Sequence, residues 1–266
     1  MLLKPKKSLG QNFLNDGNAR RRIVAACGFT PADTVLEIGP GRGAMTPMLA
    51  QEAGRVFCVE IDKRLIPDLE SKLAGTGNTA VINADFLDYD IARLAGTAGQ
   101  RLKVFGNIPY YITTPIIERL VEYRRSIDTA FLTVQKEFAK RICAAPGTKE
   151  YGSFSCYVQY YARARILFTI SRNSFFPAPK VDSSFVRLEM REEPAVRVND
   201  EEKLFAIIRA AFGQRRKTLK NALTRIVPAR QMEEFFCQRR IDPRIRAEKL
   251  SLQDFAIIAD LSTCRV

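Results

Sequence analysis

A glycine-rich loop near the amino terminus has the residue types of a nucleotide-type ligand site. The run Glu37-Ile38-Gly39-Pro40-Gly41-Arg42-Gly43-Ala44 follows a short apolar segment and opens a helical pattern, and Glu60 ends the next apolar segment. Glycines let the backbone approach a ligand closely, and a carboxylate about 20 residues further on can accept two ribose hydroxyls. The spacing fits both NAD and S-adenosylmethionine (SAM). Pro40 lacks an N–H group and no Lys-Ser/Thr pair follows, which excludes a P-loop.

A second candidate, Asn83-Ala84-Asp85-Phe86, lies just after the third apolar segment. A carboxylate there can accept the exocyclic amine of an adenine ring while Phe86 packs against the face of that ring. Taken alone, Asp85 fits a turn or a helix cap equally well.

The run Asn107-Ile108-Pro109-Tyr110 ends the fourth apolar segment, where an open α/β sheet places its ligands. An exocyclic base amine is a poor nucleophile because its lone pair is delocalised into the ring. The side-chain oxygen of Asn107 and the carbonyl of Ile108 can each accept one N–H and so direct the lone pair at a methyl donor. Pro109 fixes the turn, and Tyr110 offers a face on which an extruded base can stack.

The composition excludes several other chemistries. The chain has no histidine, which rules out a Ser-His-Asp triad, a Cys-His dyad or an HExxH zinc site. Its six cysteines never fall in a CxxC spacing, which is typical of a reduced cytosolic protein without a metal site. No run of about 18 uncharged apolar residues occurs, so neither a membrane span nor secretion is expected.

Alternating apolar and helical segments must position these candidates. Asn15 or Asp16 can cap a helix that ends at Cys27-Gly28. Apolar runs at 34–38, 55–61, 79–83, 102–108 and 128–134 alternate with helical patterns such as 47–53 and 65–74. This alternation predicts an α/β fold with a mostly parallel sheet and helices on both faces. The runs at 162–170 and 183–190 have no long helix between them and are expected to form an antiparallel edge.

The carboxyl-terminal part has a different pattern. A Pro-bearing stretch at 191–200 looks like a linker, and residues 201–212 and 247–261 show helical spacing. The sequence therefore predicts a catalytic domain over residues 1–193 and a small all-helical domain over residues 194–266.

Positive charge is concentrated at the two ends of the chain. The net charge is +13, and residues 1–22 and 200–266 each contribute +5 of it. The basic arm includes KPKK at 4–7 and Arg20 to Arg22; the basic tail includes QRRK at 214–217 and Arg239, Arg240, Arg244 and Arg246. A polyanion lying across both ends would suit this arrangement, although solvated helix faces explain it equally well.

Seven motifs in this order resemble those of the small-subunit ribosomal RNA adenine dimethyltransferases of the KsgA (RsmA) type. They are QNFL at 11–14, EIGPGRG at 37–43, EID at 60–62, NIPYYITTPI at 107–116, QKEFAKR at 135–141, FFPAPKVDS at 175–183 and FGQRRKTLKNAL at 212–223. The resemblance covers essentially the whole chain. It implies a class I SAM-dependent methyltransferase domain, Rossmann-like in fold, with a small helical domain after it.

The resemblance also implies roles for particular residues. SAM, which leaves as S-adenosylhomocysteine, would be bound without a metal by Asn12, Leu14, Gly39, Gly41, Glu60, Ile61, Asp85, Phe86 and Asn107. Asn107, Ile108, Pro109 and Tyr110 would hold the target amine, and Phe175 would sandwich the flipped adenine against Tyr110. From the residue types alone, Phe175 and Phe176 are expected in the core. The family often has Leu at position 108 and a varied residue at 111, so Ile108 and Tyr111 are mild departures.

The function implied is dimethylation at N6 of two adjacent adenosines in the 3′-terminal hairpin of small-subunit (16S) rRNA, during late assembly of the subunit. A cytoplasmic monomer is expected, which binds small-subunit rRNA and the immature subunit through the basic arm and the carboxyl-terminal domain. Three alternatives stay open: a non-catalytic assembly checkpoint or RNA-binding factor, a DNA adenine methylase, and a large-subunit rRNA adenine methylase of the macrolide-resistance type. The tail motif favours the small-subunit type over the last of these.

Overall fold

The chain divides into two compact units in the computed structural model, which describes residues 11–214 and 216–263. The first unit comprises residues 11–139 and Arg163–Glu192, and the second comprises Lys140–Ala162 and residues 193–263. The second unit thus includes residues 140–162, which lie within the catalytic domain expected from the sequence. Lys4, Lys6 and Lys7 of the basic arm, Arg215 of the basic tail and Cys264 lie outside the described residues.

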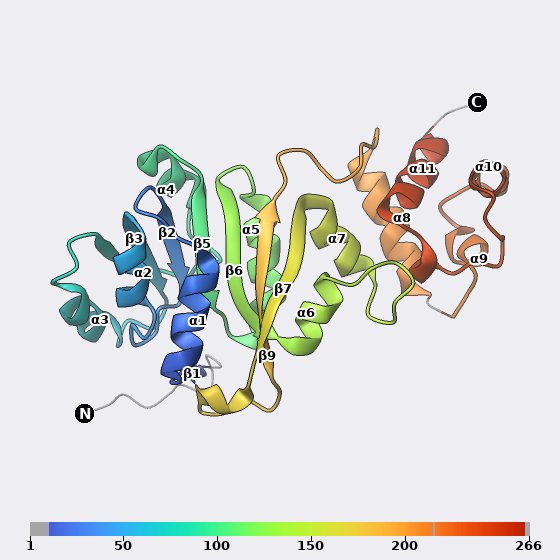
Figure 1. The fold of residues 1–266 in the computed structure, drawn as a ribbon. Helices are drawn as coiled ribbons and strands as arrows, with labels where there is room; N and C mark the ends of the chain where they lie inside the picture. Colours follow the sequence, from blue (N-terminus) through green and yellow to red (C-terminus); the bar gives the residue numbers. More distant parts are fainter. Residues whose placement is uncertain (1–10, 215, 264–266) are drawn as a thin grey trace. The chain divides into compact units, whose positions relative to one another are not determined.

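Seven strands form one mixed sheet in the order β4-β3-β2-β5-β6-β9-β7. They are β2 (Thr34–Ile38), β3 (Arg55–Glu60), β4 (Thr79–Asn83), β5 (Leu102–Asn107), β6 (Ile127–Gln135), β7 (Ala162–Ile170) and β9 (Ser183–Met190). The pairs among β2 to β6 are parallel, and β9 runs antiparallel to β6. The expected parallel sheet with an antiparallel part at one edge is therefore confirmed (Figure 1).

Helices cover both faces of the sheet because its strands are apolar on both sides. These helices are α1 (Gly17–Cys27), α2 (Thr46–Glu52), α3 (Ile66–Leu73), α4 (Ile91–Ala98) and α5 (Thr113–Glu122). On one face, Ile23 of α1 and Leu49 of α2 share a core with Val35 of β2. The alternate strand positions Leu36 and Val104 are fully buried as well, and α5 packs against β6.

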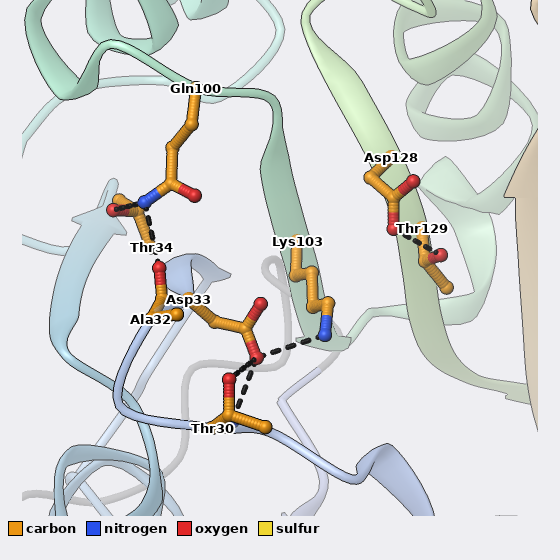
Figure 2. Close-up of polar contacts among 8 residues, drawn as sticks. All are labelled: Thr30, Ala32, Asp33, Thr34, Gln100, Lys103, Asp128 and Thr129. Atoms are coloured by element: carbon orange, nitrogen blue, oxygen red, sulfur yellow. Dashed lines mark hydrogen bonds and ion pairs between the residues drawn. The ribbon is translucent and has the colours of Figure 1, made fainter.

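Polar contacts fix the amino-terminal ends of β2 and β5 (Figure 2). Asp33 Oδ2 accepts hydrogen bonds from Thr30 N (2.7 Å) and Thr30 Oγ1 (3.0 Å) and pairs with Lys103 Nζ at 2.9 Å. Gln100 Nε2 donates to the Ala32 carbonyl and to Thr34 Oγ1, both at 2.9 Å. Burial raises the pKa of Asp33, but the Lys103 and Thr30 hydrogen bonds outweigh it and hold that pKa below its usual value. The two strands are thus held in register at the end opposite the glycine-rich loop.

A second, two-stranded sheet was not expected from the sequence. It joins β1 (Phe13–Leu14) to β8 (Phe175–Phe176) in antiparallel register, with Leu14 opposite Phe175. The chain continues from β1 into α1, whose amino terminus is capped by Asp16, with Asp16 Oδ1 accepting from Asn18 N at 2.9 Å. Of the two candidate caps, the structure uses Asp16.

The second unit is helical. It contains α7 (Ser153–Tyr161), α8 (Glu201–Gly213), α9 (Leu219–Leu223), α10 (Ala229–Arg239) and α11 (Leu252–Thr263), and α6 (Lys136–Ile142) spans the division between the units. Helix α8 is central and packs against α7, α9 and α11, with Phe212 in contact with Tyr151 and Phe255. This packing explains why residues 140–162 belong to this unit. No helix among the described residues is long and apolar enough to cross a membrane.

Candidate active site

One cavity of the first unit lies at the carboxyl ends of β2, β3 and β5. The chain passes outward from β2 to β3 and β4 and then returns to β5 on the other side of β2, so the sheet has its topological switch point here. Every site residue expected from the sequence lines this cavity, namely Asn12, Leu14, Gly39, Gly41, Glu60, Ile61, Asp85, Phe86, Asn107, Ile108, Pro109, Tyr110 and Phe175. The structure therefore brings together residues from six separate parts of the sequence.

The glycine-rich loop exposes backbone to the cavity. Gly39 (φ 62°) and Gly41 (φ 60°) both adopt the left-handed conformation that favours glycine. A Cβ at Gly39 would meet no atom within 4 Å, whereas one at Gly41 would lie 3.0 Å from the Phe13 ring. A ligand can thus approach the backbone at Gly39, while the loop packs against β1 at Gly41.

Glu60 is buried at the floor of the loop. Its Oε2 accepts a hydrogen bond from Gly41 N at 2.9 Å, and its Oε1 accepts one from Asp62 N at 2.8 Å. Burial raises the pKa of Glu60, and these two N–H groups partly offset the effect. Each carboxylate oxygen has a second lone pair, so both can still accept from ligand hydroxyls.

Asp85 and Phe86 follow β4 and form another part of the wall. Asp85 Oδ1 accepts from Leu87 N at 2.9 Å, so the residue does form the turn that its type also predicts. Its other oxygen has no partner among the described residues. Phe86 is buried and Ile61 is half-exposed, which gives this part of the cavity apolar surfaces beside a carboxylate.

The Asn107 side chain is oriented by the residue that precedes β1. Its Nδ2 donates to the Asn12 carbonyl at 3.1 Å, so Oδ1 is the end of the amide that can accept a hydrogen bond from a ligand. Ile108 is buried, and Pro109 adopts φ −60° and ψ 136° before the 3₁₀ helix η2 (Tyr110–Ile112). The amide orientation thus depends on a segment 95 residues away in the sequence.

Two aromatic side chains complete the wall. The Tyr110 hydroxyl shares a 2.7 Å hydrogen bond with Ser183 Oγ, and Ser183 is fully buried at the start of β9. Burial raises the pKa of Tyr110, and the Ser183 contact partly offsets it. Phe175 is buried against Leu14, in agreement with its apolar type, and it lines the cavity as well. Phe176, by contrast, is exposed, so its expected place in the core is wrong.

Two functional candidates were missed by sequence reasoning. Ser183 gives no local signal, because its role depends on a tyrosine 73 residues away. Glu37 stands in the glycine-loop motif but received no role; it lines the cavity and is 2% exposed. Burial raises the pKa of Glu37 to about 7, while a hydrogen bond from the Cys58 thiol lowers it and the charge of Glu60 raises it further. The sequence signal that could have identified Glu37 is a carboxyl group inside an otherwise apolar strand segment.

The comparisons with known proteins agree on one family. Residues 2–263 match the family model described as ribosomal RNA adenine dimethylase. Relatives named ribosomal RNA small subunit methyltransferase A include one from Pelotomaculum thermopropionicum, 45% identical over 97% of this chain and 91% of the relative. Another, from Moorella thermoacetica, is 44% identical over 97% of this chain and 92% of the relative.

Solved structures of rRNA and adenosine methyltransferases have a similar fold. The 23S rRNA methyltransferase ErmE is similar with a TM-score of 0.75 and 29% identity, covering 94% of this chain and 99% of that one. A dimethyladenosine transferase from Plasmodium falciparum has a TM-score of 0.76 and 25% identity, covering 92% of this chain and 95% of that one. With a class I methyltransferase fold, a cavity at its switch point and a family match over nearly its whole length, the chain belongs to the ribosomal RNA adenine dimethylase family.

Proposed function

We propose that this protein is a SAM-dependent rRNA adenine N6,N6-dimethyltransferase that modifies two adjacent adenosines in the 3′-terminal hairpin of small-subunit rRNA. The observation that carries the proposal is the orientation of Asn107. Its amide nitrogen is already bonded to the Asn12 carbonyl, so its oxygen is left to accept an N–H from a base amine inside the cavity.

The residues of the cavity fit SAM. The open space above Gly39 allows close approach to the loop, the buried Glu60 carboxylate suits ribose hydroxyls, and Asp85 beside Phe86 suits an adenine ring. Asn12, Leu14, Gly41, Ile61 and Asn107 would complete the contacts. When bound, SAM supplies a methyl group on a positively charged sulfur.

The chain's own residues then prepare the amine. Asn107 Oδ1 and the Ile108 carbonyl each accept an N–H of the target adenosine, which directs the N6 lone pair at the methyl group. Tyr110, held by Ser183, and Phe175 offer faces on which the extruded base can stack. The new N–C bond forms as the C–S bond breaks, and the extra proton leaves N6 to solvent. A second round on the same nitrogen gives dimethyladenosine.

The second unit and the basic amino-terminal arm are the parts we assign to RNA binding. Both ends of the chain carry the excess positive charge, which suits a phosphate backbone. We propose that the substrate is the immature small subunit, that the protein acts in the cytoplasm where such subunits are assembled, and that it acts as a monomer.

The small-subunit assignment is better supported than a large-subunit one. The relatives named small subunit methyltransferase A are 42–45% identical over at least 96% of this chain, against 29% for the 23S rRNA enzyme ErmE. A purely non-catalytic checkpoint is disfavoured because the cavity retains Asn107, Tyr110 and Phe175 together.

Replacing Asn107 tests the proposed site directly. Asn107→Ala removes the oriented acceptor, and turnover should fall by about 10²- to 10³-fold, the range observed for loss of one preorganised polar contact, with RNA affinity little changed. Asn199→Ala serves as the control, because Asn199 is exposed in the segment before α8. Turnover near the wild-type value in the Asn107 variant would refute its assigned role.

A further inference from the structure

Two of the large exposed apolar side chains among the described residues line the cavity. The large exposed ones are Ile61, Tyr111, Ile166, Phe176 and Val181. Ile61 and Tyr111 line the cavity itself, and Phe176 directly follows Phe175, which is part of the cavity wall. Exposed apolar surface beside a cavity is typical of a contact face for a ligand or partner.

Tyr111 differs most clearly from its neighbour in η2. The Tyr110 ring is held by the Ser183 hydroxyl and is partly buried, whereas Tyr111 is 60% exposed. The Tyr111 side chain makes no hydrogen bond or ring contact within residues 11–214 and 216–263, although it lines the same cavity. Neither packing of the first unit nor the proposed chemistry at N6 accounts for an aromatic side chain in this place.

We propose that Tyr111 is a stacking platform for the nucleotide next to the adenosine that occupies the cavity. This inference rests on the proposed function, in which the target is one of two adjacent adenosines. Extruding one base separates it from its neighbour, so that neighbour loses a stacking partner. An exposed aromatic ring can replace this partner, and single-stranded RNA is commonly bound in this way. Tyr110 and Tyr111 are consecutive in the chain and would meet consecutive nucleotides.

The platform has a consequence for the order of events. After the first adenosine is modified, the strand must advance or retreat by one nucleotide so that the second adenosine enters the cavity. Tyr111 would then stack on whichever of the two adenines lies outside the cavity. Its effect is expected on binding of the RNA and on selection of the adjacent pair, while SAM is held by other residues.

The test uses the full-length protein and small subunits from a strain that lacks the modification. Tyr111→Ala should raise KM for the subunits by about 5- to 100-fold, the range for loss of one base–aromatic stack, and should change kcat less. Tyr111→Phe keeps the ring and should stay within about twofold of wild type, since stacking needs only the aromatic face. Ile166→Ala, an exposed apolar residue of β7 that does not line the cavity, is the matched control.

Equilibrium binding of SAM separates this role from a structural one, and all three variants should bind SAM as wild type does. The inference is overturned if Tyr111→Ala leaves KM for the subunits unchanged, if its defect lies in SAM affinity, or if Tyr111→Phe loses as much as Tyr111→Ala. Wild-type protein that transfers no methyl group to these subunits would instead contradict the proposed function.

Discussion

The two ends of the Asn107 side-chain amide have different hydrogen-bonding roles. Because its nitrogen donates to the Asn12 carbonyl, its oxygen is held as an acceptor before any substrate arrives, and no rotation is needed at the moment of reaction. Tyr110 is preorganised in the same way, because its hydroxyl is fixed by Ser183 and its ring therefore keeps one orientation. Preorganised groups of this kind are the main contribution that a protein can make to methyl transfer, because the methyl donor is supplied by the cofactor.

The raised pKa of Glu37 predicts that the stability of the folded protein depends on pH. Its folded-state pKa is about 7, above the ordinary value of 4.5. Between these two values the unfolded chain releases the proton and the folded chain keeps it, so stability falls as pH rises through this window and levels off above it. The contribution is on the order of 3 kcal/mol.

Denaturant unfolding of the cofactor-free protein between pH 4.5 and pH 8 measures the effect. Glu37→Gln cannot titrate, so its stability relative to wild type should improve by that amount as pH rises. Glu52→Gln, the same substitution at an exposed residue of α2, is the matched control. A difference between Glu37→Gln and wild type that stays constant across the range would contradict the raised pKa.

Sequence reasoning at the residue scale identified the cavity wall but not its supports. Gly39, Glu60, Asp85 and Asn107 could be selected because each lies at the carboxyl end of a strand or just after it, where an α/β sheet places its ligands. The contact between Ser183 and Tyr110 could not be predicted, because it depends on β9 inserting beside β6. The residue types likewise predicted that Phe175 and Phe176 would share the core, whereas only Phe175 is buried.

At the scale of elements, the small β1–β8 sheet connects the amino-terminal segment to the site. Leu14 is 3% exposed and packs in the same core as Phe175, and Asn12, directly before β1, supplies the carbonyl that orients Asn107. Shortening Leu14 should therefore affect both stability and catalysis. We expect Leu14→Ala to lower the free energy of unfolding by about 2–4 kcal/mol and to lower kcat in addition, because β1 loses its anchor.

The control for this prediction is Ile23→Ala. Ile23 is fully buried in the same core but lies on α1, away from the Asn107 contact. It should cost similar stability, and kcat measured where both variants are folded should stay near wild type. An equal loss of kcat in the two variants would show that general loosening, rather than β1, is responsible.

The long strands were predictable and the short ones were not. The runs at 34–38, 79–83, 162–170 and 183–190 coincide with strands. The first of these, β2, is buried throughout, and strands covered on both faces are nearly continuous in apolar residues. The strands β1 and β8 have two residues each and pair residues that are 161 and 163 positions apart, so no local pattern marks them. Helix α7 was missed because its aromatic residues fit a strand pattern as readily as a helix.

At the scale of the whole molecule, the charge at the two ends predicts salt-dependent binding. Arg216 and Lys217 are exposed in the basic tail motif. If both contact phosphates, replacing them with glutamine should weaken RNA binding and reduce the slope of log Kd against log salt by about one for each contact. Methyl transfer at saturating RNA should be unaffected. Measuring RNA binding across a salt series checks this prediction. An unchanged slope would contradict the assignment of RNA binding to the second unit.

Methyl transfer with identified products shows which RNA this protein modifies and how many methyl groups each adenosine receives. Labelled SAM is supplied to small subunits purified from a strain that lacks the modification, and the nucleosides of the recovered rRNA are resolved by mass. We expect N6,N6-dimethyladenosine in the small-subunit rRNA, at two adjacent positions of its 3′-terminal hairpin. Transfer that occurs only on large-subunit rRNA or on DNA, with none on the small subunit, would contradict it.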